Sequence, residues 1–182
     1  MQKKNRVPQD KLYQLKPQLY SLSSVIYSFQ DLLDLFKQHL GDYPGTLLQK
    51  PVAIEYLSLK ENILLAYSIA DPKNKYKEQI IEDTFEKSGI DLNHLSSIPL
   101  ADLPLETILK VQLVTHFLCQ TKIILLDNWI AKLPEEDMKE VTLFLKHICR
   151  QQGCAILIYT SNNTVMKQCD ETIYLDSFLS VS

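Results

Sequence analysis

Residues 122–136 read KIILLDNWIAKLPEE and contain the most apolar run of the chain, which ends on one aspartate. The four branched residues 123–126 predict a short buried strand of a parallel sheet, because strands covered on both faces are apolar throughout. Asp127 then stands at the carboxyl end of this strand, where ligands bind in open α/β sheets. A carboxylate there is either a magnesium ligand or the solvated end of a core strand. On this run alone the second interpretation is favoured.

The composition limits the possible functions. The 182 residues are 46% hydrophobic and 23% charged, so the chain can bury one ordinary core and is most simply a single domain, 1–182. A net charge of −3 gives no basic surface for nucleic acid. No apolar run reaches the roughly 18 residues of a membrane span, and the N-terminus lacks the apolar segment of a signal peptide. We therefore expect a cytoplasmic protein that another subunit recruits to the inner face of a membrane.

The cysteines and glycines argue against two kinds of site. The four cysteines show neither CxxC nor histidine-paired spacing, so we expect reduced thiols and no zinc. A phosphate-binding loop alone commonly uses three glycines, and the whole chain has only 4. We expect no cofactor.

The N-terminal part has the order strand, loop, helix. Residues 12–22 alternate well enough for a strand or hairpin. Leucines and Phe36 recur at helical spacing over 31–40, and Gly41 can end that helix. This order is the layout of a phosphate-binding loop.

The spacing of Asp127, Leu133 and the helix expected after them resembles the Walker B strand and D-loop of ABC-type ATPases. Residues 49–65, QKPVAIEYLSLKENILL, resemble the Q-loop passage of the same family without a gap, and the resemblance extends from about Leu12 to the C-terminus. It implies an α/β, P-loop NTPase-like fold with a mainly parallel sheet and helices on both faces. It also implies a small helical subdomain at about residues 60–110.

At the family's nucleotide-binding positions this chain carries other residues. Aligned with the Walker A loop, residues 23–31 (SSVIYSFQD) hold serine or isoleucine at the glycine positions. Phe29 replaces the lysine and Gln30 replaces the magnesium-binding hydroxyl. A Walker A loop needs glycines so that backbone N–H groups can approach the phosphates, and a lysine to neutralise charge. The resemblance therefore implies that the anion cradle is lost.

The other motifs differ in the same way. Asn128 stands at the catalytic glutamate and Ser161 at the switch histidine, and serine has no imidazole donor. The signature motif falls on 103–107 (LPLET), without its serine and glycines. Trp129 replaces a proline and is either a core filler or a contact residue.

The resemblance implies a catalytically inactive ABC-ATPase-like subunit that serves as scaffold or regulator of a membrane-associated transport complex. Gln49 is retained, and we expect it to line, with Tyr56, Leu57 and residues 59–63, a groove that receives a helix of the membrane subunit. An intact ABC ATPase subunit is a second expected partner. Two alternatives stay open: a weak ATP-binding half-site completed by an intact ATPase, and a secretion or envelope component that uses the fold only for protein contacts.

Overall fold

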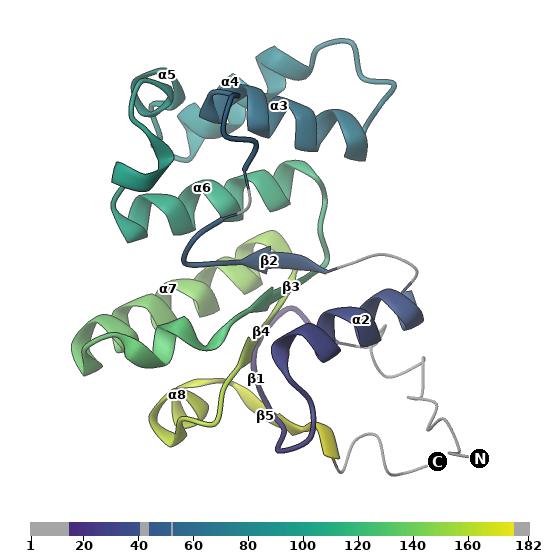
Figure 1. Ribbon diagram of the computed structural model, residues 1–182, viewed down its shortest axis with the longest axis vertical. Coiled ribbons are helices and arrows are strands. Elements are labelled where there is room, and N and C mark those ends of the chain that lie inside the picture. The colour runs from purple at the N-terminus through teal and green to yellow at the C-terminus, as the bar shows by residue number, and fades with distance from the viewer. Residues whose placement is uncertain (1–14, 41–43, 52, 177–182) are drawn as a thin grey trace. The chain divides into compact units, whose positions relative to one another are not determined.

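The computed structural model describes residues 15–40, 44–51 and 53–176. These residues form two compact units (Figure 1). Among the described residues, the sheet unit comprises those up to Thr46 and those from Lys122 on, and the helical unit comprises those between Leu47 and Thr121. Of the helices in the described residues, none combines the length and the apolar character needed to cross a membrane.

The five strands have the order β2-β3-β4-β1-β5 in one sheet. Their bounds are β1 (Leu19–Ser23), β2 (Gly45–Leu47), β3 (Ile123–Leu126), β4 (Ala155–Tyr159) and β5 (Glu171–Tyr174). Strand β1 pairs in parallel with β4 and with β5, and β3 pairs in parallel with β4. The last three residues of β3 are fully buried, as the apolar run predicted, and Asp127 follows directly. The α/β fold class expected from the sequence is confirmed.

Helices cover both faces of the sheet (Figure 1). They are α2 (Phe29–Leu40), the 3-10 helix η2 (Asn128–Lys132), α7 (Glu135–Gln152) and α8 (Asn163–Gln168). Leu32 and Phe36 of α2 share a buried cluster with Tyr20 and Leu22 of β1, while α7 and α8 contact β1 from the other face. Helix α7 has three acidic residues in its first turn, and Gly153 ends it at a φ of 66°.

The helical unit contains α3 (Leu59–Ala70), α4 (Lys77–Lys87), α5 (Leu92–Ser96), the 3-10 helix η1 (Leu100–Asp102) and α6 (Leu105–Leu118). Its core is built from residues of α3, α4, α5 and α6, among them Ile63, Phe85 and Val111. A capping box in which Ser58 and Glu61 satisfy each other's backbone N–H groups starts α3. These helices run from Leu59 to Leu118, whereas the helical subdomain was expected at about residues 60–110.

Two boundaries differ from the sequence-based expectation. The strand expected over 12–22 begins at Leu19, because Pro17 cannot donate a ladder hydrogen bond. Of the expected range, residues 12–14 lie outside the described part of the chain. Helix α2 begins at Phe29, so Phe29 and Gln30 lie in its first turn and not in the preceding loop. Gly41, the expected cap of α2, also lies outside the described residues.

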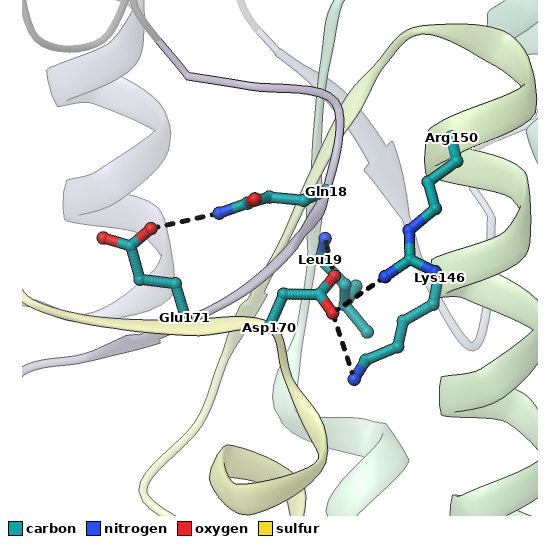
Figure 2. A network of polar contacts seen from close by, with 6 residues as sticks. All are labelled: Gln18, Leu19, Lys146, Arg150, Asp170 and Glu171. Carbon is teal, nitrogen blue, oxygen red and sulfur yellow. Dashed lines mark hydrogen bonds and ion pairs between the residues drawn. The ribbon is translucent and has the colours of Figure 1, made fainter.

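Asp170 ties the beginnings of β1 and β5 to α7 (Figure 2). Its carboxylate accepts the Leu19 N–H at 3.0 Å and lies 3.2 Å from Lys146 Nζ and 3.3 Å from Arg150 Nη2. The Asp170 N–H donates in turn to the Leu19 carbonyl at 2.8 Å. Burial acts to raise the pKa of this carboxyl, but the hydrogen bonds and the two cations outweigh it, so the pKa is lowered.

Candidate functional site

The parallel register brings the carboxyl ends of the strands to one edge of the sheet. Leu22 pairs with Tyr159, Ser23 with Tyr174, and Leu126 with Ile158. The segments that follow β1, β3 and β4 therefore leave from the same edge, which is where α/β sheets bind ligands. This edge carries the positions that the sequence aligned with the Walker A, Walker B and switch motifs.

The 24–28 loop, Ser24-Val25-Ile26-Tyr27-Ser28, joins β1 to α2 and contains neither glycine nor lysine. After it, the Phe29 ring packs at a tilt against Tyr159 of β4, with ring centroids 6.2 Å apart. Gln30 lies on the exposed side of α2 and donates from Nε2 to Asp34 Oδ1 at 3.3 Å. Phe29 is thus part of the packing beneath the loop, while Gln30 points along the helix surface.

Asp31 is a residue of this edge that the sequence analysis missed. Its Oδ2 accepts the Ser28 N–H at 2.8 Å and the Ser28 hydroxyl at 2.6 Å, and its own N–H donates to Ser28 Oγ at 3.2 Å. The hydroxyl and then the N–H of Ser28 lower the pKa of the Asp31 carboxyl. Ser-x-x-Asp before an apolar run is a capping-box pattern, so a signal was present in the sequence.

The segments after β3 and β4 carry the remaining motif positions. Asp127 accepts the Asn128 N–H at 2.7 Å and so caps η2. The side-chain amide oxygen of Asn128 is buried, and the part of the chain that the structure describes offers it no hydrogen-bond partner. Trp129 is only 5% exposed, which favours core filling over an exposed contact role. Ser161 is exposed between β4 and α8.

A groove of about 920 Å³ lies within the helical unit. One wall contains Gln49, Leu57 and the first turn of α3, and the other runs from the end of α5 to α6. Tyr56 was expected in the groove but is not among the residues that line it, and it is 86% exposed. Ile63, expected there through the range 59–63, was placed wrongly, since it is buried in the core. The lining residues are Gln49, Lys50, Pro51, Ala53, Ile54, Glu55, Leu57, Ser58, Leu59, Asn62, Ser96, Ser97, Ile98, Pro99, Leu100, Leu103, Leu105 and Ile108.

Two neutral amide side chains hold the first wall of the groove in place. Gln112 of α6 accepts the Leu48 N–H at 3.0 Å and donates to the Leu48 carbonyl at 2.9 Å. Asn62 of α3 accepts the Ile54 N–H at 2.8 Å, and its Nδ2 lies within 3.0–3.2 Å of the carbonyls of Ile54, Leu57 and Ser58. The sequence analysis missed both residues, because neither side chain belongs to a local pattern that reveals its backbone partner.

The groove is mostly apolar, with few charges. Lys50 and Glu55 contribute one charge of each sign. Ser96 is among the lining residues, and its Oγ is buried without a hydrogen-bond partner among the described residues. A groove with this lining suits an apolar helix face.

Comparisons with known proteins agree with this fold. No protein-family model matches the chain. The uncharacterized ABC transporter ATP-binding protein YclH of Bacillus subtilis (strain 168) is 23% identical over 135 residues, which are 74% of this chain and 59% of that protein. The chain thus spans 59% of the length of this curated relative.

Two solved structures extend the comparison. The structure of a metal-chelate type ABC transporter in an inward-facing conformation matches with a TM-score of 0.64 at 15% identity, over 87% of this chain and 69% of that chain. The structure of cbiO1 from Clostridium perfringens, part of the ABC transporter complex cbiONQ, matches with a TM-score of 0.60 at 15% identity, over 87% of this chain and 73% of that chain. The fold is that of an ABC transporter ATPase domain. The resemblance found in the sequence is confirmed at this level.

Proposed function

We propose that this chain is a catalytically inactive subunit of the ABC-ATPase type that acts as scaffold or regulator in a membrane-associated transport complex. The observation that carries the proposal is the 24–28 loop with Phe29. Cβ atoms crowd the backbone that would have to approach a phosphate, and no lysine neutralises the phosphate charge. The Asp31 carboxylate at the first turn of α2 adds a negative charge beside the same N–H groups.

The other motif positions support the same proposal. The side chain of Asn128 is an amide and not a carboxylate, so it cannot accept a proton as a general base in place of a glutamate. Ser161 offers a hydroxyl in place of an imidazole. Loss of one oriented electrostatic group costs a few kcal/mol of barrier, and several are replaced here.

The proposed docking surface is the groove of the helical unit. Its apolar lining and the fixed Gln49–Leu59 wall need no phosphate to bind a helix of a membrane subunit. Gln49 and Leu57 line this groove, and the exposed Tyr56 side chain is free to contact the flank of such a helix. In this proposal the protein lies at the cytoplasmic face of a membrane, held there by its partners.

One observation favours a second candidate, a weak ATP-binding half-site completed by an intact ATPase subunit. Asp127 still ends β3 at the ligand-binding edge of the sheet, where a magnesium ligand would stand. In this alternative the partner would supply the phosphate contacts that the 24–28 loop does not offer.

Binding of ATP separates these candidates. We expect millimolar Mg-ATP to leave the thermal unfolding of the purified chain unchanged, and phosphate release to match a protein-free blank. Ligand at about a hundred times its dissociation constant would stabilise the fold by roughly 2.7 kcal/mol, a shift that is easily seen. An active ABC ATPase domain serves as the positive control. Photolabelling of this chain by an azido-ATP only inside its native complex would favour the half-site alternative.

A further inference from the structure

The 24–28 loop leaves none of its backbone N–H groups from Val25 to Ser28 without an acceptor. The Ser28 N–H donates to Asp31, as described above. The N–H groups of Ile26 and Tyr27 both donate to Ser24 Oγ, at 3.0 and 2.9 Å. The Val25 N–H donates to Asp176 Oδ2 at 3.2 Å. In a phosphate-binding loop, N–H groups at the corresponding positions donate to the anion.

Asp176 reaches the loop through the pairing of β1 with β5. Ser23 pairs with Tyr174, so the residues just beyond the two strands emerge side by side. Asp176 Oδ1 accepts the Ser24 hydroxyl at 2.8 Å, which directs the Ser24 oxygen lone pairs toward the N–H groups of Ile26 and Tyr27. Asp176 therefore holds the first half of the loop, and Asp31 holds the second half.

A third contact fixes the carbonyl side of the loop. The Tyr159 hydroxyl of β4 donates to the Tyr27 carbonyl at 2.7 Å. The side chains of Val25 and Ile26 do not take part in these contacts, and the two residues are 93% and 69% exposed. An exposed loop with two exposed branched residues would be expected to move unless its backbone were fixed in this way.

We propose that the 24–28 loop is held closed by a carboxylate latch, Asp31 and Asp176 acting with Ser24, which takes the place of a bound anion. This proposal rests on the proposed function in that the subunit is taken to bind no nucleotide. The latch explains how the loop keeps one conformation without a bound phosphate. Because charge-assisted hydrogen bonds are stronger than neutral ones, the two carboxylates contribute most of the restraint.

Amide hydrogen exchange by NMR on the full chain tests the latch without nucleotide or partner. In the wild type we expect slowed exchange at Val25, Ile26, Tyr27 and Ser28, with no change when Mg-ATP is added. Asp31→Ala should speed exchange at Ser28 about tenfold or more, the effect of losing one charge-assisted hydrogen bond. Asp176→Ala should do the same at Val25 and, through the released Ser24 hydroxyl, at Ile26 and Tyr27.

Asp34→Ala is the matched control, since Asp34 lies on the same helix and accepts from the Gln30 side chain, and it should leave the loop amides unchanged. Slow exchange of the β4 amides shows that a variant is folded. If a variant does not fold, the protection of the loop amides in the wild type tests the latch by itself. Wild-type loop amides that exchange as fast as an unstructured peptide would overturn the latch while leaving the proposed function standing. ATP binding with the loop amides still protected would contradict the proposed function and support the latch.

Discussion

The 24–28 loop and the Gln49–Leu59 segment are both surface connections between secondary-structure elements, but their polar groups are arranged in opposite ways. The N–H groups of the loop donate to Asp31, Asp176 and Ser24 of its own unit, and two aliphatic side chains are left in solvent. The Gln49–Leu59 segment borders an apolar groove. Its backbone is held by neutral side-chain amides, that of Gln112 at the preceding Leu48 and that of Asn62 at Ile54.

This difference indicates where a partner can bind. A loop whose donors already have acceptors gains little from an anion, because binding would exchange one set of hydrogen bonds for another. The groove is lined mostly by apolar residues, so an occupant would bury apolar area. In our proposals the 24–28 loop thus needs no anion, and the groove is the surface that binds a protein partner.

The strongest test of this contrast is a charge placed in the groove. Tyr56→Ala combined with Leu57→Asp should weaken binding to the membrane partner at least about a hundredfold, because the new carboxylate would replace an apolar contact and lose its water on binding. The affinity of the purified chain for the membrane subunit in nanodiscs measures the effect. Circular dichroism should show that the variant remains folded.

Val25→Asp combined with Ile26→Asp, in the 24–28 loop, is the matched control for the groove variant. Both side chains already lie in solvent, so this variant should bind the membrane partner as the wild type does. If the groove variant binds normally, or if the loop variant alone loses the partner, the docking surface has been assigned to the wrong unit.

Acid should affect the two regions unequally. Asp31 and Asp170 have lowered pKa values in the folded protein, so each contributes stability above its unfolded pKa of about 3.9, and that stability is lost as the pH falls through the lower folded value. Asn62 and Gln112 do not titrate. As the pH falls below about 4, the amide protection factors, which correct for the pH dependence of intrinsic exchange, should therefore drop at Leu19 and Ser28 before they do at Leu48 and Ile54.

Asp170→Asn sharpens this expectation. The amide cannot pair with Lys146 and Arg150 as a charge, so urea unfolding at pH 7 should show a loss of about 1–2 kcal/mol and a weaker dependence on acid. Glu171→Gln is the control, since Glu171 is exposed and only accepts from Gln18, and its effect should stay within about 0.5 kcal/mol. Equal losses in the two variants would mean that the Asp170 contacts add nothing specific.

Much of the fold could be predicted from local patterns. The apolar run of β3 that ends at Asp127 and the helix expected after Leu133 depend on neighbouring residues, and both are confirmed. The Ser24–Asp176 contact could not be predicted, because its residues are 152 positions apart and meet only when β1 pairs with β5. The second wall of the groove, from Ser96 to Leu105, was missed for a similar reason, since only tertiary packing places it opposite Leu57.

The smallest expected effect concerns Asp127, which stands at the Walker B aspartate position of the family resemblance. Its structural contact is the Asn128 N–H at 2.7 Å, and an asparagine side-chain oxygen can accept that bond equally well. Asp127→Asn should therefore change the free energy of unfolding by less than about 0.5 kcal/mol and leave partner binding intact. Asp127→Ala, which removes the cap altogether, should cost about 1 kcal/mol.

Urea unfolding with and without magnesium measures both variants. Magnesium should stabilise neither the wild type nor the variants, because one carboxylate without phosphates leaves the ion mostly hydrated. A loss of several kcal/mol in Asp127→Asn, or a magnesium effect that vanishes with it, would show that this carboxylate still holds a ligand, and the half-site alternative would then replace the inactive subunit.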